Sequence, residues 1–151
     1  MDLGYTLLPD GVDVSYFDYC LIEDYEKDAS TVEDLFAFAG RCGCVKFGLA
    51  HSDLPAYIHK KGQEIDAFLE KLAAYGIFWE LNVNYDSIHG YREHDYVKAF
   101  FENKDGILDA VRKSGLKVSV GFDGHRVAEY DVRRVKDACA QLEKSGVSIF
   151  G

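Results

Sequence analysis

Hydrophobic residues recur along the chain in two alternating patterns, one with the period of a helix and one typical of buried strands. In the segment 64–76, apolar residues recur at steps of three and four, which places them on one helical face. These residues are Ile65, Phe68, Leu69 and Leu72. The following run, 77–83, is rich in β-branched and aromatic residues and predicts a strand.

The same succession of a helical pattern, a glycine-containing turn and a strand-like run occurs four times. The helical patterns cover 34–43, 64–76, 105–115 and 131–146, and the runs that follow them cover 44–50, 77–83, 116–122 and 147–150. An earlier strand-like run covers 17–22. Strands that alternate with helices of this length predict an α/β fold with about five parallel strands and the helices outside.

Length and charge narrow the class of protein. The chain of 151 residues predicts a single domain spanning 1–151. Its net charge of -9 disfavours binding to nucleic acid, and no apolar run approaches the roughly 18 residues of a membrane span. The first residues lack the basic start and apolar stretch of a secretory signal. We therefore expect a protein that binds neither nucleic acid nor membrane.

The cysteine spacing excludes the common cysteine-based sites. Cys42 and Cys44 are separated by one residue, so they form no Cys-x-x-Cys pair, and no second pair exists. Cys20 and Cys44 lie in strand-like runs and Cys139 lies in the apolar stripe of a helix. Buried free thiols of this kind predict a cytoplasmic protein.

Acidic, amide and imidazole side chains gather where the predicted strands end. They are Glu23, His51, Glu80, Asn82, Asp123 and His125. In parallel β/α folds, the carboxyl ends of the strands carry the functional site. The sequence therefore predicts one polar site formed by successive strand ends.

The residue types at these ends are metal ligands. Asp123 and His125 lie two residues apart after a strand, with Gly121 and Gly124 removing side chains beside them, and His51 follows another strand. Carboxylate and imidazole ligands suit Zn, Mn or Fe. Three such ligands with an open position are typical of a metal that activates water for hydrolysis.

Several segments together resemble the PHP (polymerase and histidinol phosphatase) family. Residues 118–126 are similar to the Gly-Ser-Asp-Ala-His-Arg segment near the end of PHP domains, and 47–54 resemble an Ala-His-Pro-Asp segment. Residues 79–82 are similar to a Glu-hydrophobic-Asn strand, 17–22 to the strand that precedes a ligand His, and 1–5 to the end of a Gly-hydrophobic-Glu-hydrophobic-Gly segment. The resemblance covers nearly the whole chain, in family order.

The resemblance implies a distorted seven-stranded TIM-like β/α barrel, up to three metal ions and hydrolysis of a small phosphomonoester. It also implies the roles of individual residues. His51, Asp123 and His125 match metal ligands, with Asp2 in the place of a bridging Glu, and Asp123 and His125 are the expected catalytic residues.

Two departures from the family pattern change these expectations. The chain has no His-x-His strand and no His before His51, and Asp24-Tyr25-Glu26 stands where a strand-end His is expected. We therefore expect an N-terminally truncated PHP-like domain, an incomplete (βα)7 barrel with an incomplete metal cluster. An open sheet has exposed edges, so a homo-oligomer that closes the sheet is a further expectation.

The remaining polar residues are candidates for two roles, binding the substrate and orienting the metal ligands. Arg126 and Arg92 are candidates to bind a substrate phosphate through a guanidinium group. Glu80 and Asn82 are candidates to orient a ligand imidazole, although Glu80 also fits a structural charge. Two functions stay open: a metal-dependent, histidinol-phosphatase-like phosphoesterase, and a catalytically inactive PHP remnant that acts as an interaction or regulatory module.

Overall fold

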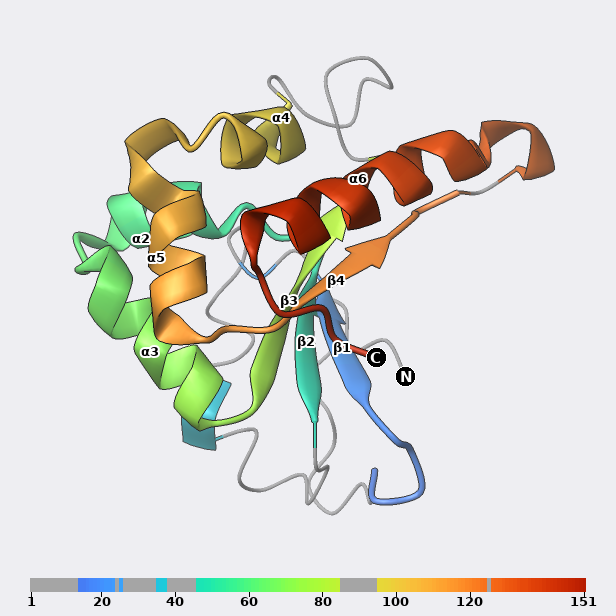
Figure 1. Cartoon of the computed structure of the whole chain (residues 1–151). Coiled ribbons are helices and arrows are strands. Elements are labelled where there is room, and N and C mark those ends of the chain that lie inside the picture. The colour runs from blue at the N-terminus through green and yellow to red at the C-terminus, as the bar shows by residue number, and fades with distance from the viewer. Residues whose placement is uncertain (1–13, 24, 26–34, 38–45, 85–94, 125) are drawn as a thin grey trace.

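The computed structural model describes residues 14–23, 25, 35–37, 46–84, 95–124 and 126–151. Its centre is a four-stranded parallel sheet in the order β1-β2-β3-β4 (Figure 1). The strands are β1 (Cys20–Glu23), β2 (Phe47–Ala50), β3 (Ile77–Asn82) and β4 (Val118–Gly121). The predicted α/β class with a parallel sheet is confirmed.

Helices follow the strands in sequence and cover one face of the sheet. They are α2 (Leu54–Lys61), α3 (Ile65–Ala74), α4 (Tyr96–Phe101), α5 (Ile107–Ser114) and α6 (Val132–Ser145), with short 3₁₀ turns η1 (Lys104–Gly106) and η2 (Val127–Glu129). Figure 1 shows α2, α3 and α5 side by side, while α6 packs along β4. The helices predicted at 64–76, 105–115 and 131–146 are therefore confirmed as α3, α5 and α6, and most of the one predicted at 34–43 lies outside the described residues.

Two helices were not predicted, although each begins at a residue typical of a helix start. The side chain of Asp53 accepts a hydrogen bond from the backbone N–H of Ala56 and caps α2. The side chain of Asp95 accepts one from the N–H of Lys98 and caps α4. Both helices are short, so their apolar periodicity is too brief to be recognised by pattern alone.

The two faces of the sheet carry different residues because side chains alternate along each strand. In β3, Ile77, Trp79 and Leu81 belong to the main hydrophobic core. Their alternates are Phe78, Glu80 and Asn82, which therefore lie on the opposite face. The core is formed with helix residues such as Leu69, Leu72, Val111 and Leu142. The face away from the helices is thus the one that carries polar groups.

Glycines on the two neighbouring strands make room for side chains of β3 on that polar face. A Cβ built on Gly48 of β2 would lie 2.3 Å from the ring of Phe78. A Cβ built on Gly121 of β4 would lie 1.9 Å from Glu80 Oε1. Phe78 therefore lies over β2, and Glu80 lies over β4.

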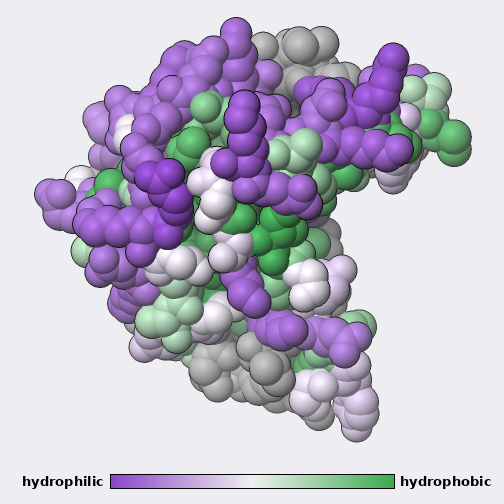
Figure 2. Space-filling view, in the orientation of Figure 1, coloured by the Kyte–Doolittle hydropathy of each residue, from purple (hydrophilic) through white to green (hydrophobic). Residues whose placement is uncertain are grey.

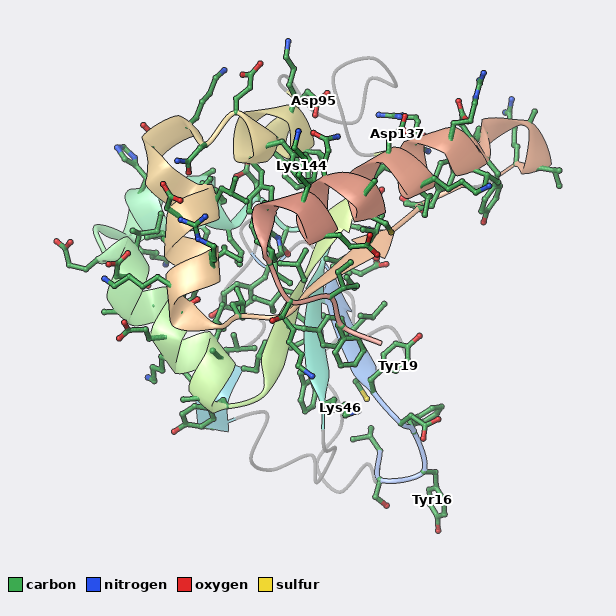
Figure 3. The ribbon with its side chains drawn as sticks, in the orientation of Figure 1. Tyr16, Tyr19, Lys46, Asp95, Asp137 and Lys144 are labelled. Carbon is green, nitrogen blue, oxygen red and sulfur yellow. The ribbon has the colours of Figure 1, made fainter. Side chains whose placement is uncertain are left out.

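The prediction of a full strand at 147–150 was wrong. It forms one isolated parallel bridge between Val118 and Ile149 beside β4. The ring of Phe150 then stacks on Phe78 with centroids 3.8 Å apart, and Lys46 lies 5.3 Å from the centroid of the Phe150 ring. Figure 3 shows Lys46 and Tyr19 near this end of the sheet. The final run therefore lies beside the first residue of β4, with Phe150 on the face of the sheet that carries Phe78.

The surface of the helices is mostly hydrophilic (Figure 2). In the same view, hydrophobic side chains gather in the hollow beneath α6, and a smaller group lies at the start of that helix. Val127 and Val132 near this start are 91% and 61% exposed. The start of α6 therefore carries apolar side chains that face solvent.

Candidate functional site

The carboxyl ends of the four strands meet at one edge of the sheet, as the sequence predicts. Glu23 is the last residue of β1 and pairs with Ala50, the last residue of β2. His51 follows directly, Glu80 and Asn82 lie in the second half of β3, and Asp123 lies two residues beyond β4. The parallel register therefore brings residues 100 positions apart in the chain to one place.

The imidazole of His51 is surrounded by carboxylates from the three other strands. His51 Nδ1 lies 3.5 Å from Glu23 Oε1 and 3.9 Å from Asp123 Oδ2. His51 Nε2 lies 3.8 Å from Glu80 Oε2. The His51 side chain is 12% exposed, so these charges interact where water screens them only in part. We name His51, Glu23, Glu80 and Asp123 the strand-end cluster.

The backbone of His51 adopts an unusual conformation at this point. Its φ of 53° lies in the left-handed region, which residues other than glycine rarely adopt. The N–H of His51 donates a hydrogen bond of 3.2 Å to Glu80 Oε2, the oxygen that also faces its imidazole. Strained residues of this kind concentrate at functional sites because the surrounding structure must hold them.

Glu80 is buried, and one of its oxygens has two donors. The residue is 8% exposed. Its Oε2 accepts one hydrogen bond from the N–H of His51 and another, of 3.3 Å, from Asn82 Nδ2. Glu80 therefore holds the position of His51 as well as facing its ring, which supports the orienting role predicted for it.

The structure brings together four of the predicted site residues: His51, Glu80, Asn82 and Asp123. Arg126 is exposed beyond β4, where its N–H donates to Glu129 Oε2 at the start of η2. Asp2, Arg92 and His125 lie outside the described residues.

Glu23 is one of the polar residues predicted at the strand ends, but it was not predicted as a ligand, because the family resemblance implies a ligand His at residue 25. Tyr25 is instead buried. Its hydroxyl lies 3.3 Å from the hydroxyl of Tyr57, and its backbone N–H donates a hydrogen bond to Ser52 Oγ. The signal for Glu23 was present in the alternation of β1. Cys20 and Ile22 are buried in the core, so Leu21 and Glu23 face the other side.

A pocket of about 650 Å³ adjoins the strand-end cluster on the face of the sheet away from the helices. Glu80 and Gly121 line one part of it, and Lys46, Ser119, Tyr19 and Phe150 line others. Of the four cluster residues, Glu80 lines this pocket, so a bound molecule would have its carboxylate beside it.

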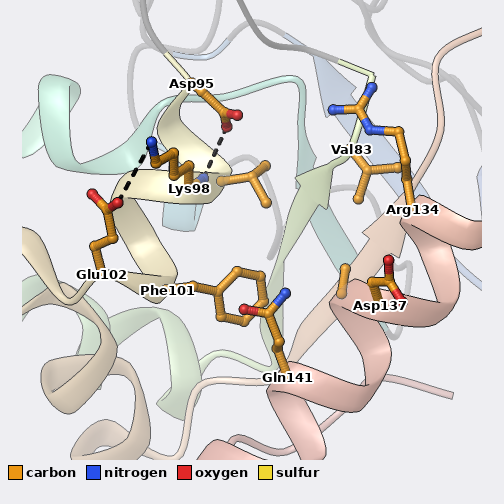
Figure 4. A pocket seen from close by; sticks show the side chains of 10 residues that line it. Val83, Asp95, Lys98, Phe101, Glu102, Arg134, Asp137 and Gln141 are labelled. Carbon is orange, nitrogen blue, oxygen red and sulfur yellow. Dashed lines mark hydrogen bonds and ion pairs between the residues drawn. The ribbon is translucent and has the colours of Figure 1, made fainter.

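A second pocket, of about 460 Å³, lies between α4 and α6 (Figure 4). Lys98, Glu102, Arg134 and Asp137 are among its lining residues. Lys98 Nζ lies 3.7 Å from Glu102 Oε1, so these opposite charges satisfy each other. None of the four residues of the strand-end cluster lines this pocket, which makes it the weaker candidate.

In the described part of the chain, no group of three or more His, Cys, Asp or Glu side chains is arranged to hold a metal ion. None of the helices in the described ranges has both the length and the hydropathy required to cross a membrane.

Comparison with models of protein families, with curated proteins and with solved structures gives no significant match.

Proposed function

We propose that this chain is a metal-dependent phosphoesterase of PHP type, which binds a divalent cation at the strand-end cluster and hydrolyses a small phosphomonoester. The observation that carries the proposal is the approach of three carboxylates, from Glu23, Glu80 and Asp123, to the single imidazole of His51. The proposal also includes a β/α barrel architecture, of which the four-stranded parallel sheet would be a part.

The residue types at the cluster suit Zn, Mn or Fe, although their spacing in the described part of the chain is not that of a metal site. An imidazole nitrogen and carboxylate oxygens are the ligand types that these ions share. His51, Asp123 and Glu23 would hold the ion, and the proposal adds His125 and Asp2 to the set. A divalent cation held there would lower the pKa of a bound water and so make it a nucleophile near neutral pH.

The chain's own residues would prepare the site for this reaction. Glu80 fixes the backbone and the ring of His51, and it closes the cluster towards β4. Arg126 and Arg92 are the proposed phosphate-binding residues, because a guanidinium can donate two parallel hydrogen bonds to phosphate oxygens. The pocket beside Glu80 would receive the organic part of the substrate.

Metal analysis and phosphatase assays test the proposal directly. Protein purified without chelator should contain Zn, Mn or Fe, and should hydrolyse p-nitrophenyl phosphate. Asp123→Ala should lose both the metal and the activity, whereas Asp137→Ala, an exposed aspartate of α6, should keep them. Absence of metal together with equal activity in the wild type and Asp123→Ala would contradict the proposal.

One observation favours the alternative, an inactive PHP remnant that acts as an interaction or regulatory module. Tyr25 stands in place of the expected ligand His and packs in the core, with ring centroids 4.8 Å from Tyr57. A phenol is a poor ligand at neutral pH because its pKa is about 10. Protein that contains no metal and has no phosphatase activity would support this alternative.

Two further expectations belong to the same proposal. Cys20 and Cys139 are free thiols in the described part of the chain, which suits a reducing cytoplasm. Self-association that closes the open sheet stays a prediction, and a mass in solution equal to that of one chain would contradict it.

A further inference from the structure

We infer that Asn84 is a positioning residue, which together with Asn82 holds the backbone of Asp123 and so places the Asp123 carboxylate beside His51. The inference rests on the proposed function for the role of Asp123. Its structural part stands on hydrogen bonds between residues 82, 84 and 123, and these are independent of any bound ion.

Backbone pairing between β3 and β4 ends just before Asp123. The register sets Asn82 opposite Gly121, and the N–H of Val83 donates to the carbonyl oxygen of Gly121 at 3.0 Å. The same register, extended by two residues, would set Asn84 opposite Asp123. Beyond the ends of β3 and β4, hydrogen bonds from side chains, and no longer from the backbone of both strands, connect the two segments.

Both backbone polar groups of Asp123 are held by amide side chains from the neighbouring segment. Its N–H donates to Asn82 Oδ1 at 3.3 Å, and its carbonyl oxygen accepts from Asn84 Nδ2 at 2.6 Å. The two amides are themselves linked, because the N–H of Asn84 also donates to Asn82 Oδ1 at 3.1 Å. We name Asn82 and Asn84 the amide clamp.

The burial of Asn84 argues that the clamp serves Asp123 and not the general stability of the core. Asn84 is fully buried, yet within the described part of the chain its Oδ1 has no hydrogen-bond partner. A buried acceptor without a hydrogen-bond partner costs free energy, and an apolar residue at the same position would not carry this cost. In the described part of the chain, the hydrogen bond that the Asn84 side chain donates goes to the Asp123 carbonyl oxygen.

The clamp has a consequence for the strand-end cluster. With its N–H and carbonyl both bound, Asp123 cannot rotate its peptide planes without breaking a hydrogen bond. The side chain extends from this fixed backbone, and its Oδ2 lies 3.9 Å from His51 Nδ1. Groups that fix a ligand residue in this way commonly change metal affinity by roughly 10- to 100-fold when removed.

Hydrogen exchange in the presence of EDTA tests the clamp without any metal. In Asn84→Ala, we expect the Asp123 amide to exchange at least about tenfold faster than in the wild type, while the amides of Trp79 and Leu81 in β3 change less than about twofold. Asn84→Asp, which keeps the size of the side chain and loses the donor, should behave in the same way. Unchanged exchange at Asp123 in both variants would overturn the inference.

Calorimetric titration with Mn²⁺ tests the functional part. Asn84→Ala should bind Mn²⁺ at least about tenfold more weakly than the wild type. The matched control is Asn103→Gly, which removes another amide donating to an acidic residue, at a position where φ is 52° and glycine is comfortable. Equal affinity in the wild type and Asn84→Ala would overturn the inference. A wild type that binds no Mn²⁺ would overturn the proposed function, and the exchange experiment would still decide the clamp.

Discussion

The carboxylate of Glu80 occupies the space above Gly121 that a Cβ would fill in any other residue. That Cβ would lie 1.9 Å from Oε1 and 2.2 Å from Cδ of Glu80. Glu80 also accepts a hydrogen bond from the N–H of His51, which follows β2. By leaving room for the Glu80 carboxylate, Gly121 indirectly allows this hydrogen bond to form. A glycine in β4 is thus a condition for the orientation of a histidine after β2.

Gly121→Ala should therefore displace Glu80 and destabilise the fold. Overpacking of this kind costs about 1–3 kcal/mol, which a urea titration would show as a lower midpoint. In a Glu80→Ala background the same substitution should cost much less, because the clash is gone. A double-mutant cycle measures this coupling, and equal costs in the two backgrounds would show that Glu80 is not the obstacle.

Glu23→Gln should weaken binding of Mn²⁺ by at least about tenfold, because it removes a carboxylate 3.5 Å from His51 Nδ1. Glu70→Gln, which neutralises an exposed acid of α3, is the control for the loss of one negative charge. Titration calorimetry gives both affinities. Similar weakening in the two variants would mean that only net charge matters.

Asp53→Ala should destabilise the protein by about 1 kcal/mol, since it removes the side chain that caps the N-terminus of α2. Asp53→Asn keeps an oxygen acceptor and should cost much less. Urea unfolding followed by circular dichroism measures both changes. If the two variants lose the same stability, the hydrogen bond to the N–H of Ala56 is not the cause.

Trp79→Phe should also destabilise the protein. The indole Nε1 donates to the carbonyl oxygen of Ser52 at 2.8 Å, and both residues are fully buried. Loss of the indole donor leaves the buried Ser52 carbonyl with the N–H of Leu54 as its remaining donor in the described part of the chain, at a cost of about 0.5–1.5 kcal/mol. Circular dichroism in urea is the measurement, because Trp79 is the one tryptophan of the chain and the variant loses its fluorescence. An unchanged midpoint would contradict the role assigned to this bond.

Local pattern was enough to predict the parts of the fold that depend on neighbours in sequence. The helical face of 64–76 and the run 77–83 correspond to α3 and β3 because periodicity and a following glycine act within a few residues. The short helices α2 and α4 escaped this reasoning, since a few apolar residues carry too little periodicity. The final run makes one bridge with β4, and its Phe150 ring packs on Phe78, a partner 72 positions away that local pattern does not reveal.

The sequence by itself determined that polar residues follow the strands, and that parallel strands would bring their carboxyl ends to one edge. It therefore predicts that His51, Glu80, Asn82 and Asp123 lie close together. Only the tertiary structure decided that Glu23 faces His51 while Tyr25 turns into the core. Only the structure showed that Asn84 reaches the Asp123 carbonyl and that Glu80 lies over Gly121. The physical reason is that these contacts depend on the strand register and on the space left by glycines of other strands, and neither is encoded in the local pattern around each residue.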